Sequence, residues 1–209
     1  MNYKKYLTNE LKLDKQQLIG ITCLIIVISG IFGWIYEFIF YYFNGGCKTF
    51  YMQGGNFLPW INIYAIGSIM IILLTKKVRK YPIIVFLIGI ISTGILEYFS
   101  GLAIFKLYNL RLWDYNKEIL NFGNIDGFVC LRSIMFFGMS SLLLIYIILP
   151  FCIYLSKKMS KKAFLILSIT LFSIVMFDEV YNLLIARALN LPRAADFYKS
   201  LGFKYVKFN

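Results

Sequence analysis

Long apolar segments constrain most strongly what this chain can fold into. A transmembrane helix needs about 20 consecutive, mostly apolar residues, because the hydrocarbon core of a bilayer is about 30 Å thick. Five segments approach or exceed this length, and they cover residues 18–43, 57–75, 82–105, 128–155 and 163–186. The pattern predicts an all-α fold, a polytopic integral membrane helix bundle with about five transmembrane helices.

The composition agrees with a membrane protein. Of the 209 residues, 60% are hydrophobic, whereas soluble domains are closer to half apolar. The first apolar segment is too long for the core of a signal peptide, and no A-x-A cleavage site follows it. We therefore expect a single transmembrane domain over residues 1–186 and a polar, basic C-terminal tail over residues 187–209.

Basic residues are unevenly distributed between the apolar segments. The N-terminal region, residues 76–80 and residues 157–162 carry four Lys or Arg each, whereas residues 44–56 carry one. Because cytoplasmic loops are enriched in Lys and Arg, the N-terminus is predicted to be cytoplasmic. The connector over residues 106–127, between the third and fourth segments, is then predicted to lie at the outer interface. Five crossings also place the C-terminus outside, although the tail is itself basic.

Polar residues within the apolar segments are the main candidates for a functional site. A charge inside a bilayer is costly, so such residues usually face the bundle interior. They are Glu37, Asn62, Tyr64, Glu97, Arg132, Asp178 and Glu179. At about 1.5 Å of helix rise per residue, all of them fall in the predicted outer half of the membrane. We therefore expect a polar, mostly acidic cavity open to the outer face, with a purely structural ion pair at Arg132 as the alternative.

Several catalytic classes are excluded by what the sequence lacks. The chain contains no histidine, which rules out a Ser-His nucleophile and the usual zinc ligand sets. It contains no G-x-x-x-x-G-K-[ST] motif, so the chain does not itself bind nucleotide phosphates. We expect no metal, no cofactor and no nucleic-acid partner. Acid/base chemistry by paired carboxylates stays open, because buried carboxyl groups can have separated pKa values.

Four short motifs carry a resemblance to a known family. They are GWIYE (33–37), FLPWINIYAIG (57–67), ILEYFSG (95–101) and LWDYNKEILNFGNIDGFVCLRS (112–133). In this order and spacing, over roughly residues 30–140, they resemble the motifs of the membrane family called Putative ABC-transporter type IV, or CmpB-like. The chain departs from that pattern at Asn62-Ile63-Tyr64-Ala65, where the family has Pro-Ile-Tyr-Gly, and at Asn116, where it has Ser.

The resemblance implies a transporter permease that works with a separate ATPase subunit. The resemblance and the polar layer together give the expected substrate-binding residues, which are Trp34, Glu37, Asn62, Tyr64, Glu97, Tyr98, Trp113, Asp114, Tyr115, Asn121, Arg132 and Asp178. In the connector, we expect Trp113 and Tyr115 to lie at the level of the lipid headgroups. Asp114 is expected to turn inward, to cap a helix end or to meet Arg132. The alternative is that Asp114 only caps the local turn.

Three functions remain open at this point. The first is a transport component in the cell membrane, with the lipid bilayer, a separate ATPase subunit and a homo-oligomer as its partners. The second is a membrane-embedded enzyme acting on a lipid headgroup or another outer-leaflet substrate. In that enzyme Glu37 and Glu97 would be the catalytic acid and base, and Arg132 would hold a phosphate. The third is a non-catalytic membrane scaffold.

Overall fold

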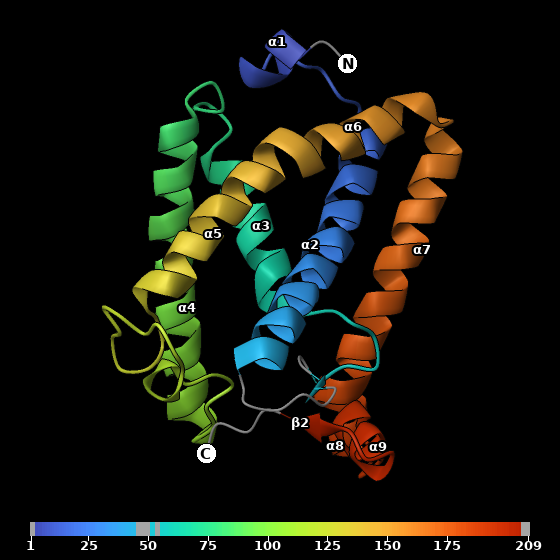
Figure 1. The fold of residues 1–209 in the computed structure, drawn as a ribbon. Helices are drawn as coiled ribbons and strands as arrows, with labels where there is room; N and C mark the ends of the chain where they lie inside the picture. The colour runs from blue at the N-terminus through green and yellow to red at the C-terminus, as the bar shows by residue number, and fades with distance from the viewer. Residues whose placement is uncertain (1–2, 45–50, 53–54, 206–209) are drawn as a thin grey trace. The chain divides into compact units, whose positions relative to one another are not determined.

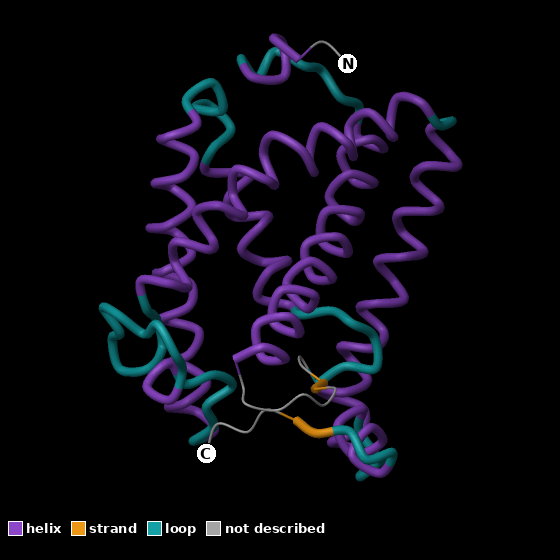
Figure 2. Tube along the Cα trace, in the orientation of Figure 1, coloured by secondary structure: helices purple, strands orange, loops and turns teal. Residues whose placement is uncertain are grey.

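The computed structural model of the chain describes residues 3–44, 51–52 and 55–205 (Figure 1). Helices make up most of the described residues, as the apolar segments predict. They are α1 (Tyr3–Leu7), α2 (Lys15–Asn44), α3 (Asn62–Leu74), α4 (Pro82–Tyr108), α5 (Leu131–Leu143), α6 (Leu149–Lys158), α7 (Lys161–Val180), α8 (Ala186–Ala188) and α9 (Ala194–Ser200). Two strands of two residues each, β1 (Tyr51–Met52) and β2 (Lys204–Tyr205), pair in parallel (Figure 2).

Short turns of other helical types interrupt or connect these helices. A 3-10 turn, η1 (Tyr115–Lys117), lies between α4 and α5. Two π-helical turns continue the long helices without a break: η2 (Leu144–Ile148) joins α5 to α6, and η3 (Tyr181–Ile185) joins α7 to α8. A π turn shifts the hydrogen-bond register of a helix and frees backbone groups for other partners.

Four helical stretches are long and apolar enough to cross a bilayer. They are Lys15–Phe43, Pro82–Tyr108, Leu131–Lys158 and Lys161–Ala188. They correspond to the first, third, fourth and fifth predicted spans, with bounds that differ by a few residues. The second predicted span, residues 57–75, contains only the 13-residue helix α3, which is about 20 Å long. The structure therefore shows four long apolar helices, and a fifth crossing stays a prediction.

The ends of the long helices follow from local sequence. Pro82 occupies the first turn of α4, where its missing N–H would have no helical partner in any case. The same helix ends at Asn109, which adopts a left-handed conformation with φ of 50° and donates its N–H to the carbonyl of Phe105 at 2.8 Å. Ser160 caps α7, because its hydroxyl accepts the N–H of Ala163 at 3.2 Å.

The described residues divide into two compact units. Unit 1 comprises residues 3–14 and 67–155, and unit 2 comprises residues 15–44, 51–52, 55–66 and 156–205. The boundary falls inside α3, so this helix contributes its first residues to unit 2 and the rest to unit 1. The single transmembrane domain expected over residues 1–186 stays a prediction.

Unit 1 is built on the packing of α4 against α5. Small side chains allow these helices to approach closely, as is common between membrane helices. The Ser141 hydroxyl of α5 lies 3.2 Å from the Val85 carbonyl of α4, and both residues are fully buried. The same hydroxyl lies 2.6 Å from the Gly138 carbonyl of its own helix, which can take its single hydrogen. The close approach of the two helices follows from Gly89 of α4, which lies directly against Ser141 and Gly138.

Unit 2 is built on the packing of α2 against α7. Val27, Trp60, Ala65 and Val175 form its buried core. The Trp60 indole lies directly against Gly30 of α2, and its N–H donates to the Ile26 carbonyl at 3.0 Å. This contact anchors the residues that precede α3 to the middle of α2.

Candidate functional site

A buried carboxyl group lies inside the long apolar helix α4 of unit 1. Glu97 is only 4% exposed. The Tyr115 hydroxyl donates to one carboxyl oxygen at 2.6 Å, and the Ser133 hydroxyl donates to the other at 2.8 Å. Tyr115 belongs to the connector and Ser133 to the first turn of α5. Three segments of the chain therefore converge on one carboxyl group, and we call these three residues the Glu97 centre.

The fold of the connector determines the position of Tyr115. Asp114 caps the η1 turn, because its carboxylate accepts the backbone N–H and the side-chain amide of Asn116 at 3.2 and 2.9 Å. The Tyr115 N–H donates to the Gly127 carbonyl at 3.0 Å, and the Tyr115 carbonyl accepts the Asn121 amide at 3.0 Å. The backbone of Tyr115 is thus held from both sides, which directs its ring towards Glu97.

A tight turn closes the connector behind this residue. Asp126 and Gly127 both have positive φ, at 53° and 78°. A Cβ atom on Gly127 would lie 2.5 Å from a carboxylate oxygen of Asp114, so only glycine fits here. The Arg111 guanidinium donates to the Asp126 carbonyl at 2.8 Å and lies over the Phe128 ring, 4.5 Å from its centroid. The connector is therefore a folded, internally bonded structure.

The start of α5 supplies the second partner of Glu97. The Cys130 N–H donates to the Ser133 hydroxyl at 3.3 Å, in a reciprocal cap of the helix. The hydroxyl thus accepts the Cys130 N–H and donates its single hydrogen to Glu97, so it stabilises the helix end as well as the carboxyl group. We did not predict Ser133 as a site residue. A hydroxyl side chain near the start of an apolar segment, at the third residue of α5, was the only signal in the sequence.

Arg132 pairs with an acid that the sequence analysis did not select. Its guanidinium forms an ion pair with Glu118 of the connector, and the two side chains are 15% and 6% exposed. The guanidinium also lies over the Tyr115 ring, 5.5 Å from its centroid. Arg132 therefore adjoins the Glu97 centre through this ring and binds a carboxylate from outside the predicted spans.

Asp114 is 5% exposed and caps the η1 turn, so of its two expected partners it serves a helical turn and not Arg132, which pairs with Glu118. Its carboxylate also lies 3.5 Å from the Arg111 guanidinium. A short Asp side chain bonds readily to backbone N–H groups two residues ahead. The Tyr115 hydroxyl is directed to Glu97, and the placement of Trp113 and Tyr115 at the level of the lipid headgroups stays a prediction. Trp113 donates its indole N–H to the Phe128 carbonyl at 2.9 Å.

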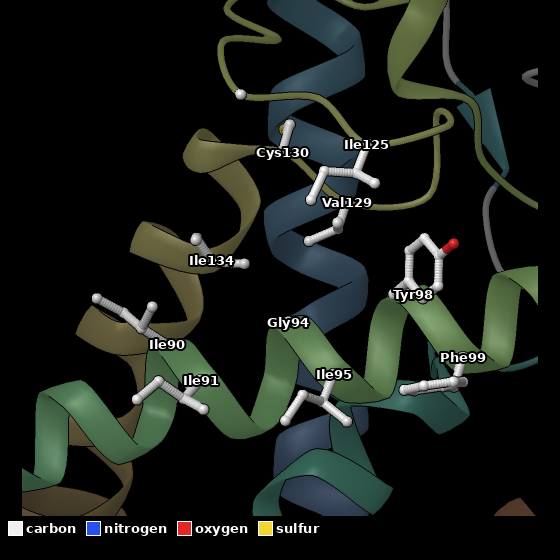
Figure 3. A pocket seen from close by; sticks show the side chains of 11 residues that line it. Ile90, Ile91, Gly94, Ile95, Tyr98, Phe99, Ile125, Val129, Cys130 and Ile134 are labelled. Atoms are coloured by element: carbon white, nitrogen blue, oxygen red, sulfur yellow. The ribbon is translucent and has the colours of Figure 1, made fainter.

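An apolar groove of about 430 Å³ lies within unit 1, between α4, the connector and α5 (Figure 3). Ile91, Ile95 and Phe99 of α4 line it, and all three side chains are exposed. Tyr98, also at the groove, donates its hydroxyl to Asp126 at 3.2 Å. Cys130 lines the groove and bonds to Ser133, so the groove adjoins the Glu97 centre. Its lining suits hydrocarbon, and the polar chemistry of unit 1 lies at the Glu97 centre.

In unit 2, Asp178 of α7 binds backbone groups that precede α3. Its carboxylate accepts the N–H groups of Phe57 and Leu58 at 3.0 and 2.7 Å, and the Asn182 amide at 2.7 Å. Asp178 is 7% exposed. The Asn182 side chain also accepts the Ala194 N–H at 2.7 Å, which attaches the start of α9. Asp178 and Asn182 thus organise non-helical segments of unit 2.

Two further acids of unit 2 bond to residues of α3 and of the segment before it. Glu179 accepts the amides of Asn56 and Asn62 at 2.6 and 2.7 Å. Glu37 accepts the Tyr64 hydroxyl at 3.1 Å. The depth estimate from the sequence had placed Asn62, Tyr64 and these acids at one level, and the contacts bring them together in pairs. Asn56 was not predicted, and its isolated amide before an apolar segment carried little signal.

The remaining predicted residue of unit 2 is Trp34. Its ring stacks on Phe38 one helical turn further along α2, with centroids 5.2 Å apart. Over the described ranges, no group of three His, Cys, Asp or Glu side chains gathers to hold a metal ion. The Glu97 centre belongs to unit 1, whereas Glu37 and Asp178 belong to unit 2. The single acidic cavity that the sequence suggests therefore stays a prediction.

Comparison with known proteins gives one match. The model of the family described as Putative ABC-transporter type IV matches residues 24–183. The match covers more than half of the chain and includes Glu37, the Glu97 centre and Asp178. Searches of curated proteins and of solved structures found no match.

Proposed function

Because the chain belongs to the Putative ABC-transporter type IV family, we propose that it is the permease-like membrane subunit of a transporter with a separate ATPase. The chain is a multi-pass membrane protein, as its four long apolar helices and its family agree. Its sequence has no nucleotide-binding motif, so ATP hydrolysis has to be supplied by another subunit. The N-terminus lies on the cytoplasmic side in this proposal, together with the lysine-rich regions.

The Glu97 centre is the observation that carries this proposal. An ionisable group within an apolar helix usually marks a substrate or ion pathway. The Glu97 carboxyl receives two hydroxyl hydrogens, one on each oxygen. A substrate that offers hydrogen-bond donors or a positive charge can replace one of these partners at the same oxygen. We therefore assign Glu97 the role of the substrate-contacting group.

Tyr115 is the partner that a substrate would replace. It lies in the connector, at the start of the single 3-10 turn η1, whereas Ser133 belongs to the 13-residue helix α5. Withdrawal of Tyr115 leaves Ser133 in place and one carboxyl oxygen of Glu97 accessible. The connector then acts as a gate on the Glu97 centre. The ion pair between Arg132 and Glu118 fixes the base of this gate.

The enzyme and scaffold hypotheses receive less support. The enzyme hypothesis requires Glu37 and Glu97 as acid and base, and the family that the chain matches is described as a transporter family. Glu37 bonds to Tyr64 in unit 2. The scaffold hypothesis requires only that the polar contacts hold the helices together. It predicts that loss of the Glu97 carboxylate changes the amount of protein in the membrane and nothing else.

The test combines affinity purification with complementation. The full chain, tagged and expressed at its native level, is purified from native membranes, and the associated proteins are identified by mass spectrometry. We expect an ATPase with a Walker motif among them. A Glu97→Gln variant should reach the membrane at normal levels and retain this ATPase, yet fail to restore the phenotype of a deletion strain. The matched control is Glu10→Gln, because Glu10 is exposed and lies outside the apolar helices.

Two results would count against the proposal. Recovery of the chain without any ATPase, under conditions that preserve other transporter complexes, removes the permease role. A Glu97→Gln variant that is depleted from the membrane, with Glu10→Gln unaffected, supports the scaffold. The predicted homo-oligomer is tested by expressing two differently tagged copies of the chain in the same strain. If the chain forms a homo-oligomer, purification through one tag recovers the copy that carries the other tag.

A further inference from the structure

A buried arginine lies in unit 1 at the opposite end of α4 from the connector. Arg79 belongs to the short turn between α3 and α4 and is 8% exposed. Its guanidinium lies over the Tyr6 ring of α1, with the central carbon 5.0 Å from the ring centroid. Its carbonyl accepts the Tyr146 hydroxyl at 2.6 Å. Both its backbone and its side chain are thus fixed in position.

The charge of Arg79 has no acidic partner in the described part of the chain. Among the described residues its guanidinium forms no ion pair and no side-chain hydrogen bond, and its Nε–H is buried without a hydrogen-bond partner. Burial lowers the pKa of Arg79 from its ordinary value, and Tyr6 opposes this effect. A cation–π contact offsets only part of the hydration that a buried charge loses. An anion at the guanidinium would supply the compensation.

A hydrogen bond to a π-helical turn fixes the Tyr6 ring beneath this guanidinium. Tyr6 is 1% exposed, and its hydroxyl donates to the carbonyl of Ile145. Ile145 lies in the π-helical turn η2, where backbone carbonyls are available to partners outside the helix. Burial raises the pKa of Tyr6, so the hydroxyl remains a donor. The π turn therefore fixes α1, and α1 in turn fixes the platform under Arg79.

The surroundings of Arg79 carry further positive charge. Lys76, Lys77 and Lys80 of the same turn are exposed, as are Lys4 and Lys5 of α1. Basic residues at the end of a membrane helix attract anionic lipid headgroups. A guanidinium can bind two phosphate oxygens at once, whereas ammonium groups add charge around it. This arrangement has the composition of a phosphate site beside a membrane.

We propose that Arg79, with Lys77 and Lys80, binds the headgroup phosphate of an anionic phospholipid at the end of unit 1. The lipid phosphate meets the guanidinium that Tyr6 supports, and the lysines surround it. The site lies on the predicted cytoplasmic side and is separate from the Glu97 centre, so it is independent of the proposed transport role.

The test measures lipid binding to the purified full-length protein. Phosphatidylglycerol is titrated into protein held in phosphatidylcholine nanodiscs, and bound phosphatidylglycerol is counted by native mass spectrometry. We expect an Arg79→Gln variant to bind about tenfold more weakly than the unmodified protein, as loss of a charge-assisted pair implies. The matched control is Arg187→Gln, an exposed arginine of α8 in unit 2, which should bind normally. Inorganic phosphate, tested as a competitor, should not displace the lipid at millimolar concentration.

A second variant keeps the proposal testable if Arg79→Gln does not fold. A double Lys77→Gln, Lys80→Gln variant removes exposed charges alone, and it should weaken phosphatidylglycerol binding several-fold. Equal binding by the unmodified protein and the folded variants overturns the proposal. Displacement by inorganic phosphate overturns the assignment to lipid, because the site would then accept a soluble anion.

Discussion

Replacement of Tyr115 by Phe probes the Glu97 centre with the smallest possible change. The substitution removes one oxygen and leaves the ring, which packs against Arg132, in place. It takes away the donor to one oxygen of the Glu97 carboxyl group, at 2.6 Å, while Ser133 still serves the other oxygen. The change therefore isolates one hydrogen bond to one buried carboxyl group.

The structure sets the expected magnitude. A hydrogen bond to a charged group contributes about 1.5–3 kcal/mol, and Glu97 is too buried for water to replace the lost donor. Neutral side-chain bonds between membrane helices average only about 0.6 kcal/mol, so the prediction depends on a charge-assisted bond. At about 2–4 °C for each kcal/mol in a chain of this size, the melting temperature should fall by roughly 3–12 °C.

Tyr98→Phe is the matched control, because it removes the same atom from the same unit. In the unmodified protein the Tyr98 hydroxyl donates to Asp126 at 3.2 Å, and Asp126 is exposed, so water can replace the lost donor. A change at such a surface position usually alters stability by less than about 0.5 kcal/mol. The assay is thermal unfolding in detergent, followed by near-ultraviolet circular dichroism. Equal losses in the two variants would refute the reasoning, since they would show that burial of Glu97 does not strengthen the bond.

Two further predictions concern contacts of unit 2, each with a control variant. Gly30→Ala should destabilise the protein by about 1–3 kcal/mol, because the new Cβ would lie 2.1 Å from the Trp60 indole. The control Gly67→Ala, in the part of α3 that belongs to unit 1, has 3.7 Å to its nearest neighbour and should be neutral or stabilising by up to about 1 kcal/mol. Equal melting temperatures of the two variants would contradict the packing of Trp60 on Gly30. Asp178→Asn should lower the free energy of unfolding by about 2–4 kcal/mol, since an amide nitrogen would face backbone N–H groups. The control Asp196→Asn, exposed on α9, should lower it by less than about 0.5 kcal/mol, as measured by denaturant unfolding. Similar values for the two variants would show that the Asp178 contacts are weak.

Hydrophobic length predicted the long helices because that property is local. An apolar segment of about 20 residues or more is rarely anything other than a membrane-spanning helix, and four of the five predicted spans appear as long helices. Counting residues along the predicted spans placed Asn62 near the depth of Glu179 and Tyr64 near that of Glu37, and each pair is in contact, whereas their depth in a membrane stays a prediction. Periodicity and rise are properties of the backbone that no tertiary contact needs to supply.

The partners of Glu97 and Arg132 could not be predicted in the same way. Tyr115 and Glu118 come from the connector, whose fold includes the tight turn at Asp126 and Gly127, and Ser133 comes from the start of α5. A change of one residue in that turn would present another side chain to the helix. Asp114 was the more conspicuous residue in the sequence, yet a neighbouring tyrosine reaches the site, because the aspartate bonds to its own turn.

The start of α3 at Asn62, five residues later than predicted, has a similarly specific cause. Residues 57–61 are as apolar as the helix that follows, and hydropathy cannot distinguish them. Pro59 disfavours helical geometry at Leu58, the residue before it. The freed N–H groups of Phe57 and Leu58 are then bound by Asp178. The acid lies about 120 residues further along the chain, so only the fold reveals the pairing.

The same contact bears on how often the chain crosses the membrane. Helix α3 alone spans about 20 Å, which is too short for a hydrocarbon core of about 30 Å. Residues 57–61 would add about 17 Å only if fully extended, whereas the chain turns here and the Trp60 N–H donates to the Leu58 carbonyl at 2.8 Å, so this segment adds less. Non-helical backbone is tolerated at membrane depth only where the protein satisfies its polar groups, and Asp178 does so for Phe57 and Leu58. Asp178 therefore makes a non-helical segment before α3 compatible with burial, whether or not that segment crosses the membrane. The prediction that the N-terminus and the tail lie on opposite sides rests instead on the five apolar segments and on the distribution of Lys and Arg.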